Sequence, residues 1–118
     1  MNVKTLLGAA LIASVSFAGS AAAESTLDQI KSSKTIKLGY RELSIPFSFV
    51  DDSKQPRGYS IDLCKIVADD VAKELKLDKL DVQWVPVTAQ SRFEALKSGK
   101  IDLECGNSTQ TLARRAEG

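Results

Sequence analysis

The sequence has no histidine and only two cysteines, Cys64 and Cys105. Each cysteine stands singly within an apolar stretch, and neither belongs to a C-x-x-C pair of the kind that binds metal ions. We therefore expect no metal site and no cofactor, and a catalytic histidine is excluded. Whether the two cysteines form a disulfide or remain separate buried thiols is left open by the sequence.

The sequence also has no large excess of one charge and no repeated or low-complexity segment. Its 16 lysines and arginines stand against 15 aspartates and glutamates, which argues against a nucleic-acid partner, because such proteins favour a basic excess. Hydrophobic residues make up 43% and charged residues 26% of the chain, the ordinary balance of a globular protein. The length suits one modest core, so we expect a single lobe and a monomer.

No apolar run reaches the roughly 20 residues that a membrane-spanning helix needs. The N-terminal run, residues 6–17, follows Lys4 and is interrupted by serines. Small residues then lead to Ala21-Ala22-Ala23 before Glu24, which is the pattern that signal peptidase requires. We predict a signal peptide over residues 1–23, cleaved after Ala23, and a periplasmic product that begins at Glu24.

The rest of the chain alternates between strand and helix patterns. Residues 35–40 alternate polar and apolar positions, which is typical of a strand, and residues 81–87 and 101–105 form two further apolar strands. This order, with helices between the strands, predicts an α/β lobe in which helices flank a parallel sheet. The expected helices cover residues 25–31, 60–75 and 90–98, and a hairpin is expected between residues 47 and 59.

Two of these helices have predicted buried sides. Ser60 is a favourable cap for the helix 60–75, and apolar residues at helical spacing predict one buried stripe along it. In the helix 90–98, Phe93 and Leu96 are expected to point inward, and Gly99 suits a left-handed end. The predicted stripe of the longer helix consists of Leu63, Ile66, Val67, Val71 and Leu75.

An arginine follows each of the three predicted core strands. These are Arg41, Arg92 and Arg114. Ligands of open parallel sheets bind beyond the carboxyl ends of the strands, and a guanidinium group matches a carboxylate with two parallel hydrogen bonds. The turn 106–109, followed by a helix start, adds hydroxyls and backbone N–H groups suited to an anion. These features predict a site for a ligand with two carboxylates; the alternative is that the arginines are simply solvated.

Four motifs connect the chain to a known family. Residues 39–49, 58–63, 96–102 and 106–109 read GYRELSIPFSF, GYSIDL, LKSGKID and GNST. Their order resembles that of the bacterial extracellular solute-binding proteins of family 3, the polar amino acid receptors of ABC importers. Within this family, the chain is most similar to the glutamate/aspartate-binding proteins.

The resemblance implies roles for five residues. Arg114 matches the arginine that grips the α-carboxylate of the ligand, and Asn107 and Thr109 match positions that help to hold the backbone atoms of the ligand. Arg41 and Arg92 match positions around the ligand side chain. Arginines there imply an anionic side chain, so the expected ligand is glutamate or aspartate, and the preference between the two is left open.

The resemblance also implies a second lobe and a partner. Family members are similar to two α/β lobes that close on the ligand and deliver it to a permease in the inner membrane. Residues 24–118 match part of the first lobe only, so we expect a truncated chain that alone binds glutamate negligibly. One departure concerns Ala89, because close relatives often have a serine there that donates to the side-chain carboxylate. Ser91 or a backbone N–H would have to replace it.

An enzyme is the alternative function, because the same fold also resembles periplasmic dehydratases of the cyclohexadienyl type and sensor domains. A dehydratase needs an acid or base in its cleft. Glu42 and Glu104 are the only acidic residues near the strand ends, and structural roles are expected for both. We therefore predict a binding protein and not an enzyme.

Overall fold

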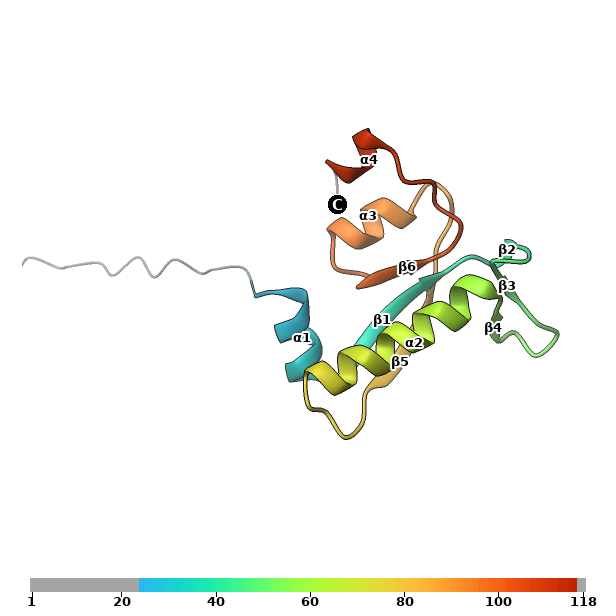
Figure 1. The fold of residues 1–118 in the computed structure, drawn as a ribbon. Coiled ribbons are helices and arrows are strands. Elements are labelled where there is room, and N and C mark those ends of the chain that lie inside the picture. Colours follow the sequence, from blue (N-terminus) through green and yellow to red (C-terminus); the bar gives the residue numbers. More distant parts are fainter. Residues whose placement is uncertain (1–23, 117–118) are drawn as a thin grey trace, which may run out of the picture.

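A three-stranded parallel sheet forms the centre of the structure, a computed structural model that describes residues 24–116 (Figure 1). β1 (Thr35–Tyr40) lies between β5 (Asp81–Pro86) and β6 (Leu103–Cys105), and both neighbours run parallel to it. The predicted α/β class with a parallel sheet and flanking helices is therefore confirmed. The predicted signal peptide lies outside the described residues.

Helices cover both faces of this sheet. Neighbouring residues of a strand point to opposite faces, and in β5 Trp84 packs against one hydrophobic core while Val85 packs against another. The first core includes residues of α2 and the second includes Ala95 of α3, so we call the two sides the α2 face and the α3 face. The helices are α1 (Thr26–Ser33), α2 (Tyr59–Glu74), α3 (Arg92–Lys97) and α4 (Leu112–Arg115).

A second, antiparallel sheet follows β1 in the chain. It contains β2 (Leu43–Ser44), β3 (Ser48–Val50) and β4 (Pro56–Arg57) in that order, and β3 and β4 form the predicted hairpin. The Ile45–Pro46 peptide bond between β2 and β3 is cis. Tyr59 N donates a hydrogen bond of 3.0 Å to the Pro46 carbonyl, so the start of α2 lies beside this small sheet.

The N-terminus of α2 differs from the prediction, because Gly58 and not Ser60 stands there. Gly58 has a φ of 122°, and a Cβ at this position would collide with the carbonyl of Phe47, so the position requires glycine. Ser60 lies inside the helix, and its hydroxyl donates a hydrogen bond of 2.6 Å to the Gly106 carbonyl. Ser60 therefore ties α2 to the segment after β6 instead of capping the helix.

The buried side of α2 consists of Ile61, Cys64 and Ala68, with Val71 and Leu75 packed beside them. This stripe also has helical spacing, but its small residues make it less conspicuous in the sequence than the predicted stripe. The prediction is right for the last two residues and wrong for the other three that it contained. Those three, Leu63, Ile66 and Val67, are between 43% and 58% exposed.

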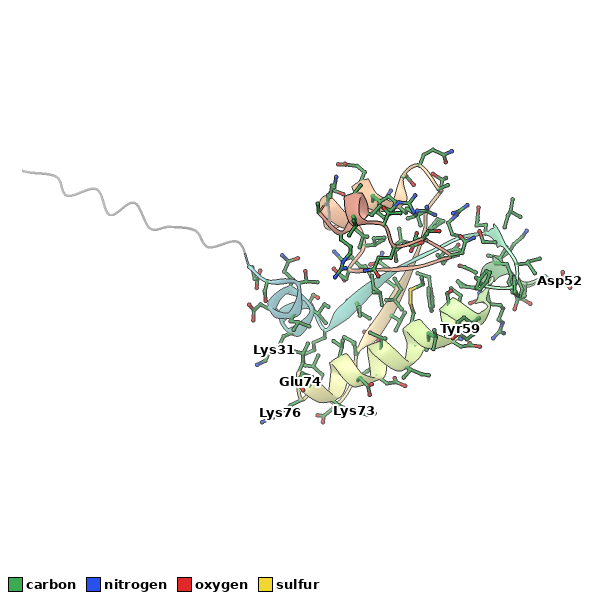
Figure 2. The ribbon with its side chains drawn as sticks, turned by 45° about the horizontal axis from the view of Figure 1, so that its top comes forward. Lys31, Asp52, Tyr59, Lys73, Glu74 and Lys76 are labelled. Atoms are coloured by element: carbon green, nitrogen blue, oxygen red, sulfur yellow. A yellow bond between two sulfur atoms is a disulfide. The ribbon has the colours of Figure 1, made fainter. Side chains whose placement is uncertain are left out.

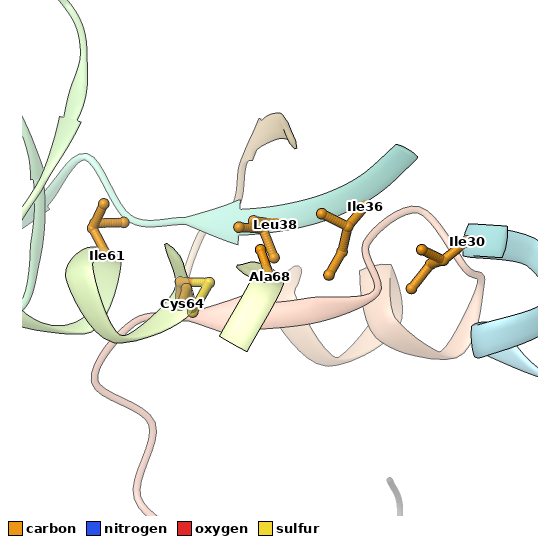
Figure 3. Packing of buried hydrophobic residues seen from close by; sticks show 7 residues of the cluster. Ile30, Ile36, Leu38, Ile61, Cys64 and Ala68 are labelled. Carbon is orange, nitrogen blue, oxygen red and sulfur yellow. A yellow bond between two sulfur atoms is a disulfide. The ribbon is translucent and has the colours of Figure 1, made fainter. Parts of the chain in front are cut away.

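The main hydrophobic core lies on the α2 face. Ile36 and Leu38 of β1 pack there with Ile30 of α1 and the buried residues of α2 (Figure 3). Cys64 and Cys105 form a disulfide within this core, with their Cα atoms 6.1 Å apart. Figure 2 shows it as a yellow bond between α2 and the sheet. The structure therefore decides for the disulfide where the sequence left the state of the cysteines open.

The α3 face holds a smaller core. Ala95 is buried, whereas Phe93 and Leu96, which were predicted to point inward, are only half-buried. Gly99 follows α3 with a φ of 69°, which confirms the predicted left-handed end. β6 starts later than predicted, because the Asp102 carboxylate accepts a hydrogen bond of 2.7 Å from the backbone N–H of β1. Across residues 24–116, no helix combines the length and apolar character of a membrane span.

Candidate functional site

Three arginines stand where the parallel strands end. Arg41 follows β1 directly, Arg92 is the first residue of α3, and Arg114 lies in α4. Because β5 and β6 both run parallel to β1, their carboxyl ends meet at one edge of the sheet. Figure 1 shows α4 beside α3, and the contact of an α4 arginine with Phe93 confirms this neighbourhood.

Arg92 and Arg114 are brought together by Phe93. The guanidinium carbon of each arginine lies 5.1 Å from the centroid of the Phe93 ring. Arg114 has a second anchor, because its Nη1 donates a hydrogen bond of 2.6 Å to the Thr109 carbonyl. Sequence reasoning placed Phe93 in the core and missed this role. Its position directly after a candidate site residue was the only clue.

Arg92 is a nearly buried cation. It is 8% exposed, and its Nε is buried with no hydrogen-bond partner in the structure. Within residues 24–116, none of the three site arginines forms an ion pair with a carboxylate, whereas Arg57 pairs with Asp51 at 2.9 Å. Burying a cation without a counter-charge or a full set of acceptors is costly. None of these three positive charges is therefore directly paired within the part of the chain that the structure describes.

Arg41 lies beside the residue that opens the segment after β6. A Cβ at Gly106 would collide with the Glu104 carboxylate and would lie 3.1 Å from Arg41 Cγ, so the missing side chain of Gly106 gives these two groups their space. The backbone of Arg41 is held by Ser48, whose Oγ accepts from Arg41 N at 2.8 Å and donates to Arg41 O at 3.1 Å. Oε1 of Glu104 is buried without a hydrogen-bond partner.

Arg114 and Arg41 line two separate shallow hollows and not one common cavity, and Arg92 is in the wall of neither hollow. A hollow of about 180 Å³ contains Arg114 and Thr109 in its wall, together with Phe93. A second hollow of about 270 Å³ is lined by Arg41 and by the segment that leads to α3. A larger hollow of about 530 Å³ lies at the other end of the sheet, next to α1, where Lys37 and Asp102 already neutralise each other. We therefore place the candidate site at the two smaller hollows.

The segment after β6 differs in one respect from the prediction. No helix begins directly after the turn 106–109, because α4 starts at Leu112, where the Thr111 Oγ1 accepts from Arg114 N at 3.2 Å. Asn107 and Thr109 are exposed, and Ser108 has a buried Oγ without a partner. The turn thus offers polar side chains and backbone groups, but without the help of an adjoining helix start.

The turn before α3 contains the serine that was expected to replace the one missing at Ala89. The Ser91 Oγ accepts hydrogen bonds from Thr88 N at 3.0 Å and from Thr88 Oγ1 at 3.1 Å. The contact between the two hydroxyls leaves either one able to donate, and Thr88 Oγ1 also accepts from Ser91 N at 3.0 Å. Ser91 is therefore oriented by the turn, and its hydroxyl lies directly before Arg92.

Tyr40 borders the site at the end of β1. Burial raises the pKa of its phenol above the ordinary value, and the nearby Glu42 carboxylate raises this pKa further. The ring packs edge-on against Trp84, with the centroids 6.3 Å apart. Tyr40 is therefore neutral around pH 7, and both rings pack against the core of the α2 face.

Comparison with known proteins gives a consistent result. Residues 36–117 match the family model of the bacterial extracellular solute-binding proteins, family 3. The L-glutamate/L-aspartate-binding protein of Pseudomonas aeruginosa is 40% identical over 116 residues, which cover 96% of this chain and 38% of that protein. The chain spans between 33% and 38% of the length of the first curated relatives that it matches.

Two solved structures extend the comparison. An ancestral amino acid-binding protein, described as a precursor of cyclohexadienyl dehydratase, is 34% identical with a TM-score of 0.67, over 78% of this chain and 38% of that one. The arginine-bound domain 1 of the arginine-binding protein TmArgBP, a Phe57Trp mutant in its own numbering, is 28% identical with a TM-score of 0.62. It covers 76% of this chain and 64% of that one.

Proposed function

Because the chain belongs to the bacterial extracellular solute-binding proteins of family 3, we propose that it forms the first-lobe wall of a periplasmic receptor for glutamate or aspartate. The receptor would deliver its ligand to an ABC permease in the inner membrane and would act as a monomer. The relatives support this ligand class, because one of them is the glutamate/aspartate import solute-binding protein of Escherichia coli. The predicted signal peptide over residues 1–23 supports the compartment.

The three arginines without a directly paired carboxylate, within residues 24–116, are the observation that carries the proposal. Arg92 is nearly buried with a free Nε, and Arg114 shares its aromatic neighbour. Charge-assisted hydrogen bonds from the guanidinium groups to a carboxylate would offset the cost of burying the cation. A ligand with two carboxylates supplies one anion for each hollow.

The two hollows suggest how such a ligand divides between them. We assign the α-carboxylate to Arg114, with Asn107 and Thr109 beside it, because a hydrogen bond to the Thr109 carbonyl holds the Arg114 guanidinium at that hollow. We assign the side-chain carboxylate to Arg41 and Arg92, with the Ser91 hydroxyl in place of the serine that Ala89 lacks. Each arginine then has an anionic partner.

Residues 24–118 constitute only part of the proposed receptor. A second lobe that closes over the edge would remove water from the arginines and strengthen their attraction for the carboxylates. Without it, the same groups stay in a screened environment, where ion pairs contribute little. Domain 1 of one relative is described with bound arginine, so a single lobe of that relative holds an amino acid. We therefore revise the expectation of negligible glutamate binding by this chain to weak, millimolar binding.

The proposal is tested by nuclear magnetic resonance of the isotope-labelled protein. The Nε–Hε signals of the arginines are followed during titration with L-glutamate and with its neutral isostere L-glutamine. We expect glutamate to shift the signals of Arg41, Arg92 and Arg114 and to bind about fivefold more tightly than glutamine. Arg57, which is paired with Asp51, is the internal control.

Variants sharpen this test. Arg114→Ala is expected to weaken glutamate binding about tenfold, because it removes a charge-assisted contact. Arg57→Ala is the matched control and is expected to leave glutamate binding unchanged. An equal response to glutamate and glutamine, or a glutamate response confined to Arg57 and Arg115, contradicts the proposed function.

A dehydratase is the second candidate function, because one structural neighbour is described as a precursor of such an enzyme. Its acid would have to reach the substrate. Glu104 is a poor candidate for this acid, because its Oε1 is buried next to Gly106. Glu42 is exposed to solvent. Incubation of the protein with prephenate-like substrates distinguishes the two: turnover that Glu104→Gln abolishes would replace the receptor by an enzyme.

A further inference from the structure

Phe93 holds two like-charged side chains from different parts of the chain. Arg92 is its neighbour in α3, and Arg114 comes from α4, yet both guanidinium carbons lie 5.1 Å from the same ring centroid. The two cations are thus no farther apart than twice this distance. Like charges repel each other, so an attractive group is needed to keep them together. The negative faces of an aromatic ring provide this attraction.

The ring also lies over the guanidinium of Arg92. Its Nε has no hydrogen-bond partner, and within residues 24–116 no carboxylate pairs with it. Arg114 has the Thr109 carbonyl as a second anchor. Phe93 lines the hollow of Arg114 and Thr109, so the ring stands at the site itself and not behind it.

An aromatic ring differs from a carboxylate in a way that matters here. A carboxylate would fix an arginine by neutralising its charge and occupying its N–H donors, and the ligand would then have to displace it. A ring attracts the cation through its quadrupole and leaves the N–H donors in the guanidinium plane available for another acceptor. The ring can therefore fix the arginines while their charge remains available to an anion.

We propose that Phe93 is a positioning residue of the ligand site: its ring holds Arg92 and Arg114 at a spacing that lets one dicarboxylate ligand engage both. This inference rests on the proposed function. Phe93 acts through the two arginines, and a side chain of similar bulk without a π-system fills the same space but does not hold them.

The first test needs no ligand. Phe93→Leu and Phe93→Tyr are compared with the unchanged protein by nuclear magnetic resonance. Protons above an aromatic face are shifted upfield, so we expect upfield-shifted Cδ and Nε protons on Arg92 and Arg114 in the unchanged protein and in Phe93→Tyr. The shifts are expected to vanish in Phe93→Leu, while the signals of Arg57 stay in place.

The second test measures selectivity. Phe93→Leu is expected to weaken L-glutamate binding about three- to tenfold and to bring its affinity close to that of L-glutamine, whereas Phe93→Tyr stays within about twofold of the unchanged protein. Leu96→Ala, in the same helix and also half-buried, is the matched control. We expect it to lower the thermal unfolding temperature while the preference for glutamate over glutamine remains.

The outcomes separate the two proposals. If the unchanged protein does not discriminate glutamate from glutamine, the proposed function fails and the ligand role of Phe93 fails with it. If discrimination is present but survives in folded Phe93→Leu, only the role of Phe93 is overturned. The same holds if Arg92 and Arg114 show no upfield shifts in the unchanged protein.

Discussion

The α2 face and the α3 face of the same sheet are built in contrasting ways. On the α2 face, apolar side chains such as Leu38 are fully buried, and a disulfide crosses the core. On the α3 face, the buried set is small, and a nearly buried arginine with a free Nε lies beside it. The buried groups of the α2 face are apolar and pack against one another. The α3 face instead has, within residues 24–116, a charged side chain without a paired carboxylate and a hydrogen-bond donor without a partner.

The two faces of the sheet therefore contribute to different properties of the protein. Apolar burial and the disulfide stabilise the lobe from the α2 face, which gives the α3 face room for groups that are unfavourable in isolation. The arginines are then fixed by a ring and by a backbone carbonyl instead of by carboxylates. Mutations on the two faces should therefore affect different measurements.

The largest effect is expected from Leu38→Ala. This side chain is fully buried in the α2-face core, so its truncation should lower the free energy of unfolding by about 2–5 kcal/mol, measured by urea titration. Val82→Ala is the matched control, because this β5 side chain is 38% exposed and should change stability by less than about 0.5 kcal/mol. Similar losses in the two variants would contradict the assignment of the main core.

A somewhat smaller effect is expected when both cysteines are replaced by alanine. The disulfide joins positions separated by 41 residues, so its removal should cost about 2–4 kcal/mol through the greater freedom of the unfolded chain. Urea titration with and without a reducing agent measures the loss. The double variant should be insensitive to the reducing agent, whereas a reducing agent that leaves the unchanged protein equally stable would refute this contribution.

The smallest effect on stability is expected from Asp51, a paired carboxylate that lies outside the candidate site. The backbone N–H of Gln55 and the guanidinium of Arg57 lower the pKa of the Asp51 carboxyl below its ordinary value. A lowered folded-state pKa means that this stabilisation is present above the ordinary pKa and is lost as pH falls through the folded-state value. The unchanged protein should therefore lose more stability than Asp51→Asn on acidification below about pH 4. Equal losses in acid unfolding curves would show that the turn does not depend on this charge.

Much of the fold follows from local patterns in the sequence. β1 has the predicted bounds because strict alternation marks a half-buried strand, and Gly99 ends α3 as expected because few other residues adopt its backbone conformation. The three candidate arginines were selected from their place after the strands. Parallel strands bring their carboxyl ends to one edge, so this step needs no knowledge of side-chain contacts.

Other features depend on contacts between distant segments and could not be predicted from the sequence. α2 has two apolar stripes, and only packing against β1 decides that Cys64 and Ala68 are buried while Ile66 is exposed. Ser60 has the chemistry of a cap, but its hydroxyl bonds to Gly106 instead. The cation-binding role of Phe93 required the position of α4, which no periodicity reveals.

The disulfide between α2 and β6 has a consequence for proteolysis. The loop between α2 and β5 lies within the span that Cys64 and Cys105 enclose. If a protease cleaved this loop, the two pieces would stay covalently attached, and they would separate on a gel only after reduction. A cut in the backbone of this loop would therefore not separate the lobe into two molecules.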